Sequence, residues 1–208
     1  GDDFEGIYLY IDRIEKMYPK VVENGEVTVN DLRRDAYFYK LEELAYDSAH
    51  VTHGRVFMHK WRKVLTQTTG SGFTMFVNID QNSVLWRLSE IILLRAECRA
   101  KLGDETGAVA DLNTIRDRAK APAYPAVYDT EGLQMAIFRE REKELLCEGH
   151  RYYDVVRNGL WKTELTPVFS GLTDKDIQNG ALYFPLTSDA FEGNNDLMLQ
   201  TPFWHNRK

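Results

Sequence analysis

Charged side chains crowd one segment of the sequence, residues 139–157 (REREKELLCEGHRYYDVVR), where eleven of the nineteen positions are Asp, Glu, Lys, Arg or His. Paired carboxylates can act as a general acid and base, but no nucleophile or oxyanion-stabilising group accompanies these. Two of the charges instead fall on the same helical stripe as the apolar Leu133 and Ile137, so burial would force them to pair. The segment therefore predicts a partly buried structural ion network. We expect its members to be Arg141, Glu144, Arg151 and Asp154.

A second group of polar residues contains three histidines and one aspartate: Asp47, His50, His53 and His59. Because His50 and His53 are three residues apart, they would share a helix face and could serve as metal ligands. The group lacks the HExxH spacing and the CxxC partner that are typical of zinc sites. We predict a polar surface helix here, with no metal and no cofactor.

The stretch Gly70-Ser71-Gly72 carries neither a hydrolase motif nor a nucleotide-binding motif. Ser71 lacks the G-x-S-x-G spacing of a nucleophile elbow, and the stretch lacks the lysine of a P-loop. A glycosidase would need two positioned carboxylates, and no pair stands out. We therefore predict no catalytic residue and expect that the chain is not an enzyme.

Aromatic side chains offer a different kind of chemistry, the stacking of rings on sugar faces. The segment from Thr66 to Asn78 is polar and Gly-rich, which predicts a loop that includes at most a short strand. An exposed ring in such a loop could contact a sugar, whereas the alternative is that the rings fold back into the core. The candidate ligand contacts are Trp61, Phe73 and Phe76. Trp86, on a patterned helix, is expected in the core.

Helical periodicity predicts the elements that must position these residues. Helices are expected over residues 83–101 and 104–119, forming an antiparallel hairpin of the size found in TPR repeats, with Leu88, Ile92, Leu112 and Ile115 buried. A second pair is expected from Thr130 to about Glu148 and over residues 151–157. A further helix should run from Phe4 to Met17. The last segment, 163–208, is expected to be an extended tail.

Composition excludes several classes of protein. The chain has 208 residues, of which 43% are hydrophobic and 28% charged, as in ordinary globular proteins. A net charge of −6 argues against nucleic-acid binding and against a polybasic membrane contact. No apolar run has the length of a membrane span. Cys98 and Cys147 are expected to be small buried thiols.

Several segments together resemble the SusD/RagB family. Glu140-Arg141, Glu144-Leu145, Glu148 to Arg151, Asp154 and Arg157 resemble its ER–EL–EG–R–D–R signature. Further likenesses follow the family order, in segments 31–35, 86–97, 111–119, 183–186 and 194–195. One departure is Gly159 after Asn158, where the family often has Trp-Gly.

The resemblance implies a fold and a function. The fold would be all-α, with TPR-like helical hairpins, irregular loops and an extended C-terminal tail, and residues 1–208 would form a single unit, the C-terminal portion of such a protein. The function would be non-catalytic capture of an oligo- or polysaccharide at the outer membrane, as a surface lipoprotein that works with a TonB-dependent SusC-like transporter. The alternative is an intracellular TPR-like adaptor that binds a protein or peptide.

Overall fold

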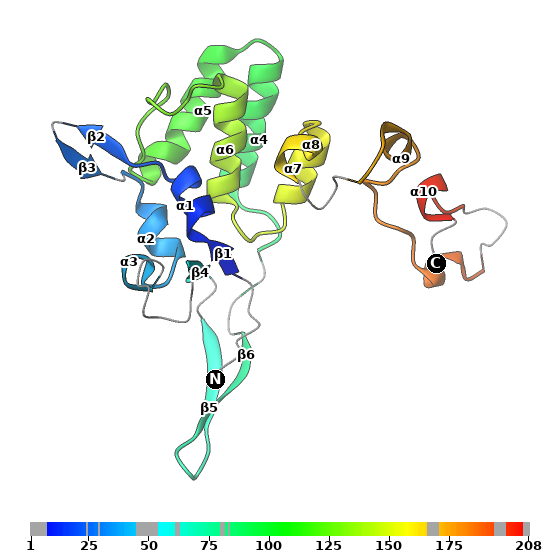
Figure 1. The fold of residues 1–208 in the computed structure, drawn as a ribbon, viewed down its shortest axis with the longest axis horizontal. Coiled ribbons are helices and arrows are strands. Elements are labelled where there is room, and N and C mark those ends of the chain that lie inside the picture. Colours follow the sequence, from blue (N-terminus) through cyan, green and yellow to red (C-terminus); the bar gives the residue numbers. More distant parts are fainter. Residues whose placement is uncertain are drawn as a thin grey trace. The chain divides into compact units, whose positions relative to one another are not determined.

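The computed structural model describes residues 8–23, 25–28, 30–44, 54–60, 63–79, 82, 84–165, 171–193 and 199–205. These parts are mainly helical, and their strands are short and paired two by two (Figure 1). The chain divides into two compact units, Gly1–Gly149 and His150–Lys208. The expectation that residues 1–208 act as one unit stays a prediction.

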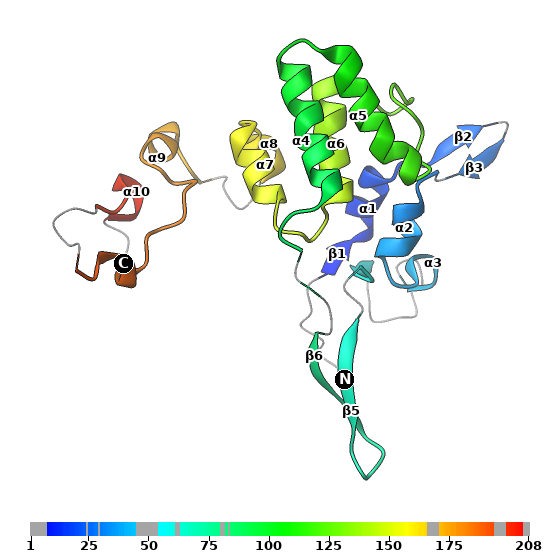
Figure 2. The ribbon, with the colours of Figure 1, turned by 180° about the vertical axis from the view of Figure 1, so that it is seen from behind.

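Three helices form the larger core of the first unit: α4 (Leu88–Lys101), α5 (Glu105–Arg118) and α6 (Leu133–Glu144). They lie side by side in both views (Figures 1 and 2). The expected hairpin of α4 and α5 is present, and the Asp104 carboxylate caps α5 by accepting from the backbone N–H of Gly107 at 2.9 Å. The buried residues of this core are Leu93, Ala96, Ala108, Leu112, Ile115, Ala136 and Ile137.

Two residues at the start of α4 differ from the prediction. Leu88 is 74% exposed and Trp86 is 68% exposed, although both were expected in the core. The reason is that the helix begins at Leu88 with Arg87 as its N-cap, so Trp86 precedes the helix. The buried stripe of α4 instead runs through Leu93 and Ala96.

A second core joins the N-terminal elements of this unit. The predicted helix from Phe4 begins only at Ile11 (α1, Ile11–Met17), because Tyr8–Tyr10 forms strand β1 and pairs with β4 (Arg55–Phe57). Strands β2 (Val21–Glu23) and β3 (Glu26–Thr28) form another pair. Helices α2 (Leu32–Tyr37) and α3 (Leu41–Leu44) follow. The buried residues are Ile14, Met17, Tyr18, Phe38, Leu41 and Val56.

The Gly-rich segment folds as a hairpin rather than as a loop with one short strand. Strands β5 (Val64–Thr68) and β6 (Thr74–Ile79) are antiparallel, with Thr68 opposite Thr74 and a register shift between Leu65 and Thr66. The turn is closed by the backbone N–H of Thr69, which donates to the carbonyl of Phe73 at 2.8 Å. Gly72 has a φ of 82°, a conformation that glycine adopts without strain.

The second unit holds short helices: α7 (Arg151–Arg157), α8 (Trp161–Glu164), α9 (Asp174–Gln178), the 3₁₀ helix η1 (Ser188–Phe191) and α10 (Pro202–His205). The segment from Thr163 was expected to be an extended tail, but its described parts include three of these elements. Hydrogen bonds from side chains to the backbone connect the segments of this unit. The Trp204 indole donates to the carbonyl of Tyr183 at 2.7 Å, and the Tyr152 hydroxyl donates to that of Leu182 at 2.5 Å.

Both cysteines are free thiols, as expected, but the prediction that they are buried is wrong: Cys98 and Cys147 are exposed. Cys98 lies on the outer side of α4, and Cys147 lies in the turn after α6. Among the helices that the structure describes, none combines the length and the apolar character needed to cross a bilayer. His50 and His53 lie outside the described residues, which contain no cluster of three or more potential metal ligands.

Candidate functional site

Two glutamates of α6, Glu140 and Glu144, form the centre of a buried ion network. They are four residues apart, so they lie on the same face of the helix, and both side chains are 0% exposed. The Arg33 guanidinium, on α2, bridges them. Its Nη2 donates to Glu140 Oε1 at 2.5 Å and its Nη1 donates to Glu144 Oε2 at 3.0 Å. The bridge ties α2 to α6 within the first unit.

Asp31 fixes the orientation of this arginine. Its carboxylate accepts two hydrogen bonds from Arg33, from Nε at 2.9 Å and from Nη2 at 2.7 Å. The same carboxylate caps α2, because Oδ1 accepts from the backbone N–H of Arg33 at 3.0 Å. One aspartate therefore starts the helix and holds the side chain that the helix presents to α6.

Arg116 of α5 extends the network in the other direction. Its Nε donates to Glu140 Oε2 at 3.0 Å, so the two oxygens of Glu140 are bound by arginines from two helices. Its Nη1 and Nη2 donate to the Asp129 carboxylate at 2.6 and 2.8 Å. Each charge is thus balanced and hydrogen-bonded, as buried ions require.

Glu144 has further partners at the C-terminal end of α6. Arg87 and Arg118 both donate to its Oε1. Arg87 Nε also donates to Glu148 Oε2 at 2.7 Å, and Glu148 pairs with Lys60 through its other oxygen. The Lys60 ammonium donates to the main-chain carbonyls of Glu144 and Leu146, each at 3.1 Å, so the cations here also satisfy the free carbonyls of the helix end.

The electrostatics keep the central carboxylates ionised. Burial raises the pKa of Glu144, but the hydrogen bond from Arg87 and the charges of Arg33, Arg87 and Arg118 outweigh it and lower the pKa to about 2. Burial also opposes ionisation of Glu140, yet Arg33, Lys143 and Arg116 lower its pKa below the ordinary value. A carboxylate held in this way neither donates nor accepts a proton near neutral pH. The arrangement is suited to holding helices together.

The residues predicted for the structural network lie in two places. Arg141 is 3% exposed, and its Nη1 donates to the carbonyl of Glu90 on α4 at 3.3 Å, while Glu144 lies at the network centre. In the second unit, Arg151 pairs with Glu164, and Asp154 accepts from Arg157 Nη2 at 2.8 Å. The ion network centred on α6 belongs to the first unit and these two pairs belong to the second. The structural role of the four predicted residues stays a prediction.

Sequence reasoning missed most partners of the central glutamates. Arg33, Arg87 and Arg116 were not predicted as members, although each lies in a segment that resembles a family motif. The structure brings these motif segments together around α6. Their position in segments that resemble family motifs was the one signal in the sequence. The spacing along the chain does not indicate which arginine pairs with which glutamate.

The candidate ligand contacts lie at the β5–β6 hairpin or close to it in the sequence. Phe73 is in the turn and is 66% exposed. Phe76 belongs to β6, where its backbone is opposite Thr66. Trp61 lies outside the described residues. The hairpin therefore presents one described ring to solvent.

Comparison with known proteins identifies the chain through most of its length. The model of the SusD family matches residues 18–207. The chain belongs to the SusD family. This confirms the resemblance inferred from the motifs. The SusD family consists of non-catalytic glycan-binding proteins, which supports the expectation that the chain is not an enzyme.

Two relatives from Formosa agariphila are SusD-like proteins. SusD-like protein P38 is 33% identical over 106 residues, which are 47% of this chain and 21% of that protein. SusD-like protein P25 is 35% identical over 86 residues, which are 40% of this chain and 16% of that protein. The matched segments thus span about a fifth of these SusD relatives or less.

Solved structures agree with the fold. A SusD homologue from Bacteroides thetaiotaomicron has a TM-score of 0.68 at 27% identity, covering 94% of this chain and 38% of that one. Surface glycan-binding protein A from the same organism has a TM-score of 0.54 at 22% identity, covering 84% of this chain and 38% of that one, and shows the fold alone. The predicted all-α, TPR-like class is confirmed.

Proposed function

We propose that the chain is part of a non-catalytic, glycan-binding component of an outer-membrane uptake complex, anchored at the cell surface as a lipoprotein. Membership of the SusD family is the observation that carries this proposal. In this role the protein captures an oligo- or polysaccharide and delivers it to a TonB-dependent SusC-like transporter. Capture needs stacking and hydrogen bonding to sugar rings and no bond-making step.

Within the chain, the β5–β6 hairpin is the proposed ligand contact. Phe73 is 66% exposed at the turn, so its ring is available to stack on a sugar face. Trp61 and Phe76 complete the proposed set of contacts. Because one ring gives weak affinity, several contacts must act together for useful capture.

Calorimetry with a panel of neutral oligosaccharides tests this contact. We expect Phe73→Ala and Trp61→Ala to weaken binding about tenfold relative to wild type, the loss of roughly 1.4 kcal/mol of stacking and apolar contact. Tyr183→Ala is the matched control, because this ring is 65% exposed but lies in the second unit. Equal binding by all four proteins would remove the hairpin from the ligand site.

The transporter partnership is tested by co-purification. The chain, expressed within its full-length protein, should be retained on a tagged SusC-like transporter in detergent, with an unrelated TonB-dependent receptor as the control. Equal retention by both receptors, or by neither, would count against a specific complex.

A further inference from the structure

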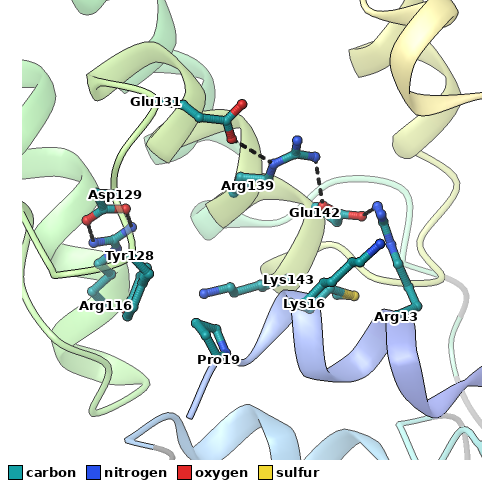
Figure 3. A pocket seen from close by; sticks show the side chains of 11 residues that line it. Arg13, Lys16, Pro19, Arg116, Tyr128, Asp129, Glu131, Arg139, Glu142 and Lys143 are labelled. Atoms are coloured by element: carbon teal, nitrogen blue, oxygen red, sulfur yellow. Dashed lines mark hydrogen bonds and ion pairs between the residues drawn. The ribbon is translucent and has the colours of Figure 1, made fainter. Parts of the chain in front are cut away.

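A cavity of about 200 Å³ lies in the first unit beside α1 and α6 (Figure 3). Its lining carries an excess of positive charge. Five of the lining side chains are arginine or lysine, and three are aspartate or glutamate. The cavity is smaller than the roughly 300 Å³ at the lower end of pockets for drug-sized ligands. Its size therefore fits a small ligand.

The three carboxylates of the lining are already engaged by the three arginines. Arg116 holds Asp129 through two hydrogen bonds, at 2.6 and 2.8 Å. Arg13 pairs with Glu142. Arg139 lies 3.8 Å from Glu131 and 3.6 Å from Glu142. Figure 3 shows these pairs among the side chains that line the cavity. The remaining cations of the lining are two lysines, Lys16 and Lys143.

Lys143 is the exceptional one, because it is buried. It is 5% exposed, and among the described residues no hydrogen bond or ion pair ends on its ammonium, although the charge of Glu140 favours its ionised form. In Figure 3 its side chain extends from α6 toward Tyr128 and Pro19. Its nitrogen lies 5.0 Å from the centre of the Tyr128 ring and 5.6 Å from that of Tyr18. The ring faces offset part of the lost hydration, but they are no substitute for an acceptor.

We propose that this cavity binds the carboxylate of a small organic anion, with Lys143 as the buried cation that pairs with it and Lys16 as the cation at the rim. This goes beyond the proposed function, because it is a site apart from the hairpin ring and selects for charge. Its ligand is either a free carboxylate or the carboxylate of an acidic sugar residue. Burial lowers the pKa of Lys143, while the charge of Glu140 raises it, and a bound anion would add to the latter effect.

A singly charged anion suits the cavity better than a dianion such as phosphate. The lining has two more cations than carboxylates, but Asp129, Glu131 and Glu142 remain close by and repel a second negative charge. Met17, Pro19 and Tyr128 supply the apolar part of the lining, against which the carbon skeleton of an organic anion can pack.

The proposal is tested by titrating the full chain with acetate, glucuronate, glucose and inorganic phosphate. Calorimetry or NMR detects the binding. We expect saturable binding of acetate and glucuronate, and at least tenfold weaker binding of glucose and phosphate. Tighter binding of glucuronate than of acetate would identify an acidic sugar as the source of the carboxylate, and equal binding would identify a free carboxylate.

Two variants and one control complete the test. Lys143→Gln should weaken glucuronate binding at least tenfold, and Lys16→Gln, at an exposed position that should not affect folding, about threefold. Lys175→Gln removes the same charge from an exposed site in the second unit and should bind like wild type. The proposal is overturned if wild type binds neither carboxylate, or if binding by Lys16→Gln and by any folded Lys143→Gln equals that of the control.

Discussion

Arg116 and Asp129 form a two-pronged ion pair in which Nη1 and Nη2 of the guanidinium bind the two carboxylate oxygens at 2.6 and 2.8 Å. The side chains are 1% and 4% exposed. Asp129 also accepts from the backbone N–H of Ala126 at 2.8 Å, which shapes the segment after α5. Because Nε of the same guanidinium binds Glu140, one arginine fixes that segment, α5 and α6 together. Loss of Glu140 should therefore affect the packing of several elements at once.

The first prediction concerns Glu144. Glu144→Gln removes the charge that Arg33, Arg87 and Arg118 share. Arg33 and Arg87 keep other carboxylate partners, but each loses one of its counter-ions in a buried or half-buried site. We expect the free energy of unfolding to fall by about 3–5 kcal/mol in urea titrations. Glu192→Gln, an exposed glutamate in the second unit, is the control and should change it by less than about 0.5 kcal/mol. Similar losses in both variants would contradict the network.

Acid should weaken the fold through the same residue. The pKa of Glu144 is about 2 in the folded chain against an ordinary 4.5, so the folded state holds the ionised form more strongly than the unfolded state does. Its contribution, roughly 3 kcal/mol, is present above pH 4.5 and is lost as the pH falls toward 2. As the pH is lowered from about 4.5 toward 2, the free energy of unfolding of wild type should thus fall more steeply than that of Glu144→Gln. Parallel pH curves would refute this.

Packing of the helical hairpin gives the third prediction. Leu112 is 0% exposed in the core of α4, α5 and α6, so Leu112→Ala should cost about 2–5 kcal/mol of stability. Leu88→Ala is the matched control, because Leu88 is 74% exposed and its truncation should cost less than about 0.5 kcal/mol. Chemical denaturation followed by circular dichroism measures both. A loss for Leu88→Ala as large as that for Leu112→Ala would show that the leucine is covered in solution.

The fourth prediction tests the second unit. Asp154 accepts from Arg157 at 2.8 and 3.2 Å and is 5% exposed, so Asp154→Ala should lower stability by about 1–3 kcal/mol and reduce the Tm. Asp174→Ala breaks an exposed pair with Lys162 and should have a smaller effect, below about 1 kcal/mol. Unchanged stability together with loss of a measurable hydrolysis would instead make Asp154 catalytic.

Local periodicity predicted the α4–α5 hairpin because apolar residues such as Leu112 and Ile115 recur at helical spacing, which is a property of neighbours along the chain. The start of α4 was not predicted correctly, because the helix begins at Leu88 rather than near residue 83, and its buried face runs through Leu93 and Ala96 while Leu88 stays exposed. The β5–β6 hairpin was missed because its Gly-rich turn dominates a short, irregular pair of strands.

The site was less predictable than the fold. The mixed pattern of charged and apolar residues on α6 correctly indicated that charges such as Arg141 and Glu144 would be buried. Their partners were not predictable, since pairing depends on which elements meet in space. Lys143 was not predicted as a site residue, because its surroundings include Tyr18 and Tyr128, which come from other parts of the chain.

The reach of Arg33 also constrains how the first unit folds. Its partners Glu140 and Glu144 are 107 and 111 residues away along the chain, so the contacts can form only after a long segment has been brought together. Closing so long a segment costs chain entropy before the contacts can offset it, which slows their formation. In an intermediate with α6 packed against α5 but without α2, Glu140 and Glu144 would be buried without Arg33, the cation that they share. Burying carboxylates that lack a counter-ion is costly. Folding intermediates that lack α2 are therefore disfavoured, so that α2, although only Leu32–Tyr37, has to join α6 as the glutamates become buried.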